Sequence, residues 1–182
     1  MSTNIDRSFL SRICDPARPA IAAPFGVDNW DVATNGRCLL ALSGRTLPVT
    51  TDQSLIAGTR RFVKLPRAVT VGVKLHRLQR WAGRADVARA VLSCDRAHGD
   101  FVSLLGGAAI NRLFLALLLD GLPGDVVRVH VPKCAIDIVS RSPTGTEYND
   151  ALIHFIGHEW VAVLMPMCEV ANKVVDHFEF TA

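Results

Sequence analysis

The sequence has 182 residues, 49% of them hydrophobic, and a formal net charge of +3. This composition excludes an intrinsically disordered chain, and the length fits a single domain spanning residues 1–182. No apolar run approaches the ~20 residues that a membrane-spanning helix needs. The five cysteines are scattered, with no CxxC pair and no secretory leader, which predicts reduced thiols in a cytoplasmic protein.

Charge is divided unevenly along the chain. Residues 1–99 hold 15 Lys/Arg against 7 Asp/Glu, whereas residues 100–182 hold 5 against 10. This asymmetry indicates either a basic face for a polyanion or complementary ends that join copies head to tail. Two ordinary solvated faces are the alternative that the sequence leaves open.

The first predicted element is a short amphipathic helix near the N-terminus. Its apolar residues recur at helical spacing, and Asn4 is placed to cap it. These residues are Ile5, Phe9, Leu10 and Ile13. Strands are then expected at residues 20–25, 30–33 and 38–42. Between the last two, Asn35-Gly36 predicts a hairpin with a type I′ turn, which needs positive φ at both central residues.

Residues 45–100 are expected to be a basic insertion or elaboration of the domain. Between residues 73 and 82, apolar side chains fall on one helical face and cations cluster toward the other. The cations of this segment are Lys74, Arg77, Arg80 and Arg84. The pattern predicts a cationic amphipathic helix.

The C-terminal half begins with a strongly apolar helix predicted over residues 108–119, which Gly121 and Pro123 end. Alternating patterns then predict strands at 127–131 and 134–138, and a hairpin of 151–156 with 160–164. Residues 168–182 form an apolar extension that could dock on a neighbour or fill a pocket of its own domain. The expected fold class is α+β, with antiparallel sheets packed on two main helices and a third helix in the insertion.

Three segments, in order, resemble the bacterial DNA polymerase III β sliding clamp family and cover about half of the chain. The hairpin A-T-N-G-R-C-L, from Ala33 to Leu39, is similar to the family's A-T-D-G-H-R-L, with Cys38 where the family has Arg. Residues 110–118 and 124–129 resemble the family's last helix and next strand. Val161–Met167 reads V-A-V-L-M-P-M, which is similar to the family's closing V-V-M-P-M.

The resemblance implies a non-enzymatic, DNA-clamp-like processivity factor for DNA replication. Such chains associate head to tail into a ring, here a homo-oligomer, because this chain has room for only one of the family's three domains. Cationic side chains would contact DNA phosphates without reading sequence. The residues implied are Arg7, Arg12, Lys74, Arg77, Arg80, Arg84 and Arg112. For each of them, an ordinary solvated cation is the alternative.

In the family, the M-P-M strand helps to form a hydrophobic pocket for short peptides of DNA polymerases and other DNA enzymes. The matching residues here are Leu39, Val163, Met165, Pro166 and Met167. Methionine suits such a pocket because its side chain is flexible and polarizable. The alternative is that these residues only end a core strand. The alternative function is a clamp-derived scaffold that binds protein and not DNA.

Catalysis has little support in the sequence. His154, His158 and Glu159 form a metal-like cluster, but the expected strand and turn do not let them converge as they would on a helix. There is no Gly-rich phosphate loop and no G-x-S-x-G motif. We therefore expect no enzymatic activity, no metal and no cofactor, with a hydrolase at these three residues as a distant alternative.

Overall fold

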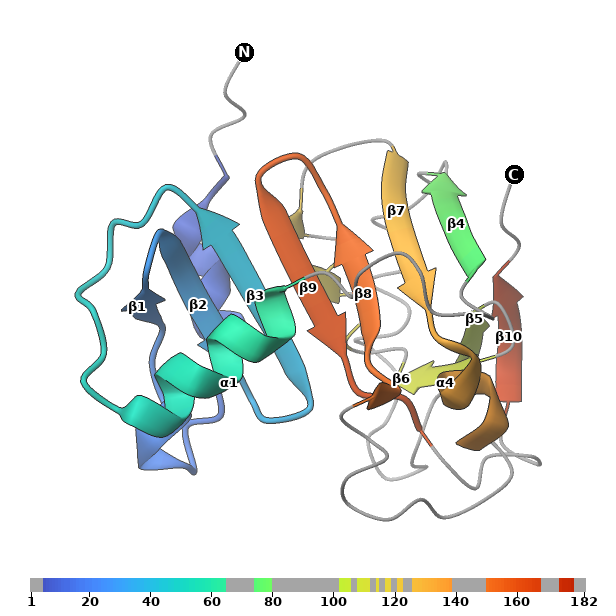
Figure 1. Cartoon of the computed structure of the whole chain (residues 1–182), viewed down its shortest axis with the longest axis horizontal. Coiled ribbons are helices and arrows are strands. Elements are labelled where there is room, and N and C mark those ends of the chain that lie inside the picture. The colour runs from blue at the N-terminus through green and yellow to red at the C-terminus, as the bar shows by residue number, and fades with distance from the viewer. Residues whose placement is uncertain are drawn as a thin grey trace.

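The computed structural model describes residues 5–64, 74–79, 102–105, 108–111, 114, 117–118, 121–122, 126–138, 150–167 and 174–178. Within these residues the chain forms a seven-stranded sheet in the order β1-β2-β3-β9-β8-β7-β4 and a three-stranded sheet in the order β10-β5-β6 (Figure 1). The strands of the larger sheet are β1 (Phe25–Val27), β2 (Trp30–Thr34), β3 (Cys38–Ser43), β4 (Lys74–Gln79), β7 (Val126–Val131), β8 (Ile153–Ile156) and β9 (Trp160–Leu164). Those of the smaller sheet are β5 (Val102–Leu105), β6 (Ala108–Asn111) and β10 (Val174–Phe178).

The expected hairpins are present, and they meet in the middle of the larger sheet. β2 pairs antiparallel with β3, and β8 pairs antiparallel with β9. β3 also pairs with β9, and Leu39 lies directly opposite Val163. This pairing joins the N-terminal and C-terminal parts of the chain into one sheet.

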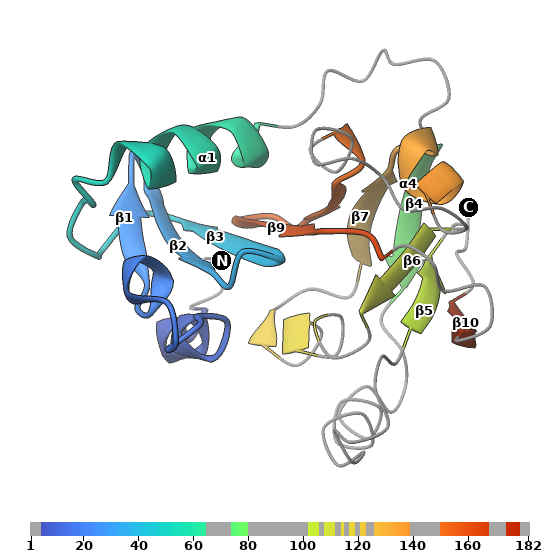
Figure 2. The same cartoon turned by 90° about the horizontal axis from the view of Figure 1, so that it is seen from below.

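Each face of the larger sheet buries a separate apolar cluster. One cluster includes Leu40 and Leu164, and the 3-10 helix η1 (Arg7–Arg12) covers it with Phe9 and Leu10. The cluster on the other face includes Leu39 and lies beneath the helix α1 (Gln53–Val63). Figure 2 shows α1 and η1 on opposite sides of the sheet. Side chains alternate between the faces of a strand, so neighbouring residues contribute to different clusters.

The N-terminal prediction needs two corrections. The first helix is a 3-10 helix that Asp6 caps, since its side chain accepts a hydrogen bond from the Ser8 amide at 2.9 Å. The predicted strand at 20–25 is instead the short 3-10 helix η2 (Pro19–Ile21), with β1 beginning only at Phe25. Proline at the first position of η2 favours a helical start, because its φ is already helical.

Three later predictions of secondary structure are wrong. Residues 74–79 form the strand β4, which pairs with β7, and not an amphipathic helix. The segment predicted as one helix over 108–119 begins with the strand β6, and the described helical residues come only after it. The strand predicted at 134–138 is the helix α4 (Lys133–Asp137), which follows Pro132. In each case the spacing of apolar residues is compatible with a helix and with a strand. Strand pairing decides for β4 and β6, and the proline that precedes α4 favours a helix there.

The division into a core domain and a 45–100 insertion stays a prediction. α1 and β4 both lie in that range, and both pack on or join the larger sheet. The C-terminal extension contributes β10, which runs parallel to β5 in the smaller sheet. No helix in the described ranges has the length and apolar character needed to cross a membrane.

Asp31 is a buried carboxylate that ties three segments together. Its side chain is fully buried on β2 and accepts hydrogen bonds from the amides of Thr46 and Leu47 at 2.9 and 2.8 Å. The Arg7 guanidinium pairs with the same carboxylate and donates to the carbonyls of Ser43 and Gly44. Burial alone would raise the pKa of Asp31, but the hydrogen bonds from Leu47 and Thr46 and the charge of Arg7 hold it below its usual value.

We predict that Asp31→Ala lowers the free energy of unfolding by about 3 kcal/mol, because it leaves the Arg7 charge and two amides without their acceptor. Urea denaturation measures the change. Asp15→Ala is the matched control, since the Asp15–Arg18 pair is exposed and should contribute little. Equal, small effects of both substitutions would show that Asp31 does not hold these segments together.

Candidate functional site

The helix α1 lies across the face of the sheet that carries Leu39. Asp52 caps its N-terminus, because the carboxylate accepts from the amides of Ser54 and Leu55 at 2.8 and 3.3 Å. Arg60 and Arg61 occupy the last turn, where cations interact favourably with the helix dipole. The apolar side of the helix therefore faces the sheet, and its cations face outward.

α1 does not close fully onto the sheet, and a cavity of about 320 Å³ lies between them. The sheet supplies Phe25, Leu39 and Val163 to its walls, and the helix supplies Leu55 and Phe62. The volume is in the range of small-ligand pockets, which are mostly apolar with a few polar groups. Thr34, Ser54 and Thr59 supply hydroxyls to this lining.

The strand register explains why the lining residues converge. Thr34 pairs with Leu39, Leu39 with Val163, and Val163 with His154. Directly paired residues project from the same face of a sheet, so these four form one row across β2, β3, β9 and β8. The first three of them line the cavity.

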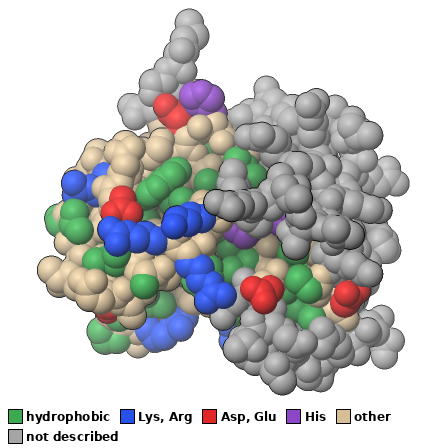
Figure 3. Space-filling model, viewed as in Figure 1, with side chains coloured by type: hydrophobic (Ala, Val, Ile, Leu, Met, Phe, Trp, Pro, Cys, Tyr) green, Lys and Arg blue, Asp and Glu red, His purple; other side chains and the backbone are tan. Residues whose placement is uncertain are grey.

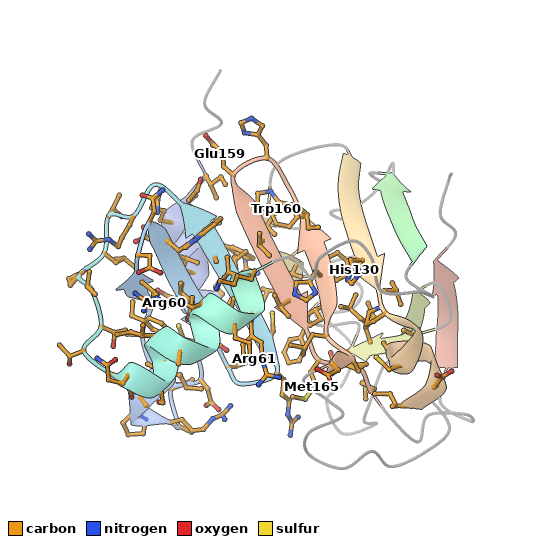
Figure 4. The ribbon with its side chains drawn as sticks, viewed as in Figure 1. Arg60, Arg61, His130, Glu159, Trp160 and Met165 are labelled. Carbon is orange, nitrogen blue, oxygen red and sulfur yellow. The ribbon has the colours of Figure 1, made fainter. Side chains whose placement is uncertain are left out.

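Arg37 gives the cavity a positive side. It is the one charged residue among the described residues of the lining, and it is exposed. It forms no salt bridge with any residue that the structure describes. On α1, Arg60 pairs with Asp28 at 2.7 Å, while Arg61 lies 4.0 Å from Asp150. Blue side chains lie next to hydrophobic ones on this face in Figure 3, and Figure 4 labels Arg60, Arg61 and Met165 there.

Cys38 also lines the cavity, but it is not a nucleophile. Its side chain is buried, and this burial raises the pKa of the thiol to about 12. The reactive thiolate is therefore almost absent at neutral pH. The groups that face the cavity are apolar surfaces, hydroxyls and one guanidinium, which suit binding.

The structure brings together three of the five residues predicted to bind peptide. Leu39, Val163 and Met165 all line the cavity. Pro166 is buried, and the Met167 amide donates to the Ala109 carbonyl at 2.8 Å. The Met167 amide anchors the end of the strand to β6, and neither residue is part of the cavity wall.

Of the residues predicted to contact DNA, the structure describes the side chains of two, Arg7 and Arg12 on η1. The Arg7 guanidinium is turned inward to Asp31, and Arg12 lies over the Phe9 ring at 5.4 Å. Lys74 and Arg77 lie on the strand β4 instead of a helix. The other three, Arg80, Arg84 and Arg112, lie outside the described residues.

The metal-like cluster does not converge. His154 is buried on β8, whereas His158 is exposed in the turn before β9, 4.0 Å from the Glu159 carboxylate. Both ring nitrogens of His154 face backbone carbonyls. The described residues contain no group of three or more metal-binding side chains.

Sequence reasoning missed the helix that forms the other wall of the cavity. The signals were present, because Asp52 is a good N-cap and apolar residues follow at helical spacing. Those residues are Leu55, Ile56, Phe62 and Val63. Gly58 and two adjacent arginines obscured the pattern.

A scan against protein-family models finds no match, and a search of curated proteins finds none either. A search of solved structures finds a similarity to the structure of DNA polymerase III subunit beta from Borrelia burgdorferi in complex with a natural product. The TM-score is 0.49 at 10% sequence identity, and the match covers 88% of this chain and 60% of that chain. The similarity is distant and lies at the level of the fold.

The β2–β3 turn at the edge of the cavity depends on Gly36. The hairpin is confirmed, but the type I′ assignment is wrong, because Gly36 has φ +81° while Asn35 does not have positive φ. Asn35 instead accepts hydrogen bonds on its side chain from the amides of Arg37 and Cys38, at 2.9 and 2.8 Å. These side-chain hydrogen bonds form an Asx-type turn, so the chain reverses direction without a positive φ at Asn35.

We predict that Gly36→Val lowers the free energy of unfolding by about 2 kcal/mol, because a β-branched residue resists positive φ. Gly58→Ala is the matched control in the same lining. Gly58 is helical, and an added Cβ would make only an ordinary contact with Phe62 at 3.8 Å. It should stabilise by about 0.8 kcal/mol in the same urea assay. A neutral Gly36→Val would mean that the turn does not require this conformation.

Proposed function

We propose that this chain is a clamp-like protein that works by binding, and that it holds a short segment of another protein in the cavity between α1 and the sheet. The observation that carries the proposal is the convergence of Leu39, Val163 and Met165 on one apolar cavity. Their sequence pattern resembles the peptide-binding motif of the sliding-clamp family. Leu39 and Val163 lie 124 positions apart in the chain, and the β3–β9 register supports the same grouping independently of that pattern.

The cavity size and lining favour a peptide with one or two apolar anchor side chains. A volume of about 320 Å³ accommodates such anchors and not a folded domain. Hydroxyls and exposed backbone at the edge can pair with the peptide main chain. Met165 adds an adaptable surface, which suits several related sequences.

The charge at the mouth favours acidic residues beside the anchor. Arg37 is exposed, unpaired with any described residue, and accompanied by Arg61 on the facing helix. No acidic side chain is among the described residues of the lining. A carboxylate of the bound segment would thus meet a guanidinium with little competition, and a bidentate pair would add specificity.

We predict that Gly58→Leu weakens peptide binding at least tenfold, because the new side chain projects into the cavity from a helix that tolerates it. The probe is a set of peptides selected on the wild-type protein from a random 12-residue library, with affinity measured by fluorescence polarisation. Ala57→Leu is the matched control, since it adds the same side chain to an exposed position of α1 outside the lining. Equal loss in both variants, or no peptide enriched over an unrelated protein, would contradict the proposal.

Charge preference provides a separate prediction on the same probe. Selected peptides should carry Asp or Glu near an apolar residue, and Arg37→Glu should weaken their binding about tenfold while a glutamate-to-lysine change in the peptide restores it. Restoration distinguishes a charge contact from a misfolded variant. Selected peptides without acidic residues, or no effect of Arg37→Glu, would remove the charge argument and leave the apolar one.

Ring assembly and sequence-independent DNA binding stay predictions from the sequence resemblance. They need a cationic surface, and the structure describes the side chains of only two residues of the predicted set: Arg7, which is paired with the buried Asp31, and Arg12, which is exposed. For this reason we propose peptide binding as the primary function.

A further inference from the structure

His154 and His130 form a buried pair of imidazoles beside the cavity. They are only 5% and 7% exposed, they lie opposite each other on β8 and β7, and their ring centroids are 5.8 Å apart. His154 continues the row of Leu39 and Val163, so the pair lies next to the cavity wall on the same face of the sheet. The label in Figure 4 places His130 to the right of α1.

His154 holds the C-terminal end of α1. Its Nε2 lies 3.0 Å from the carbonyl oxygen of Phe62, a residue 92 positions away whose side chain lines the cavity. The last carbonyls of a helix have no partner within the helix, so an imidazole N–H is a suitable cap. The other nitrogen, Nδ1, lies 3.2 Å from the Leu152 carbonyl.

This hydrogen bond fixes the end of α1 that borders the cavity. The helix packs Leu55, Ile56, Phe62 and Val63 against the apolar cluster of the sheet, but these side chains are only partly buried, and Thr59 is the one buried residue of the helix. The ion pairs of Arg60 and Arg61 with aspartates are exposed, and such pairs contribute little. His154, itself buried, adds a part-buried side-chain hydrogen bond between the sheet and this helix.

We propose that His154 is a proton-controlled tether: its neutral ring holds the end of α1 on the sheet, and acid releases the helix and opens the cavity, because the ring takes up a second proton more readily in water than when it is buried beside His130. The tether and its test do not depend on peptide binding, whereas any effect on a bound peptide rests on the proposed function.

The surroundings favour the neutral rings. His130 has no hydrogen-bond partner for either nitrogen among the described residues, so a charge on it would be buried without an acceptor. Among the side chains that the structure describes, the charged residues of α1 near the pair are the cations Arg60, Arg61 and Lys64, and β9 has none. The described carboxylate near this end of the helix is the exposed Asp150, 4.0 Å from Arg61.

The direction of the pH effect follows from these groups. Burial lowers the pKa of His154, and the neighbouring His130 lowers it further, against the opposing effects of the Phe62 and Leu152 carbonyls. Burial also lowers the pKa of His130. The tethered state therefore binds protons less readily than a hydrated, open state, so its advantage is full above the ordinary histidine value near 6.5 and is lost as the pH falls below it.

Hydrogen exchange of the α1 amides, corrected for intrinsic rates, tests the proposal between pH 7.5 and 5.5. A histidine that stays neutral in the tethered state and titrates near pH 6.5 in the open state raises the ratio of open to tethered molecules about tenfold between pH 7.5 and pH 5.5. Protection of α1 should fall by this factor relative to β3 and β9. His154→Gln, which keeps an N–H for Phe62, should abolish the pH dependence. The matched control His158→Gln removes a histidine that is 89% exposed and should change nothing.

Equal loss of protection in α1 and the strands would indicate global acid unfolding and would overturn the tether. So would a His154→Gln protein whose α1 keeps the wild-type pH dependence. If that variant does not fold, nitrogen NMR of the wild-type histidines still decides. The tether requires an Nε2–H tautomer at His154 and a titration midpoint below the ordinary histidine value near 6.5, and either a midpoint above that value or the other tautomer refutes it.

Discussion

The rest of this structure depends on the register between β3 and β9. Leu39 lies opposite Val163, so two segments at opposite ends of the chain present one apolar row to α1. A shift by one residue would turn Leu40 and Ala162 toward the helix and send the present row into the other cluster. The cavity, its neighbour His154 and the position of α1 all follow from this pairing.

The two faces of the sheet are held in different ways. On the η1 face, the Asp31 carboxylate and close-packed Phe9 and Leu10 fix the covering segment. On the α1 face, partly buried apolar side chains, exposed ion pairs and one part-buried hydrogen bond hold the helix, and an incompletely filled space remains between it and the sheet. Elements with few buried contacts open at low free-energy cost, so binding and movement belong on the second face.

The sequence predicted the parts of the fold that local chemistry determines. The β2–β3 and β8–β9 hairpins carry turn residues between alternating runs, and both formed. The strand β4 was predicted as a helix, because the spacing of its apolar residues fits the period of a helix as well as that of a strand. Its pairing with β7 makes it a strand. For the cavity, the resemblance of the hairpin and the M-P-M strand to the sliding-clamp family predicted Leu39, Val163 and Met165 as binding residues, but it did not predict that Phe62 and His154 lie at or beside the cavity. Their roles arise from contacts between residues far apart in sequence, which no local pattern encodes.

The location of a bound peptide tests the central claim most directly. The chain has three methionines, so methyl-labelled methionine gives three NMR signals, and only Met165 lines the cavity among those that the structure describes. Titration with a library-selected peptide should shift the Met165 methyl signal strongly and the Met167 signal weakly. A peptide that binds and leaves the Met165 signal unchanged would show that the cavity between α1 and the sheet is not the binding site.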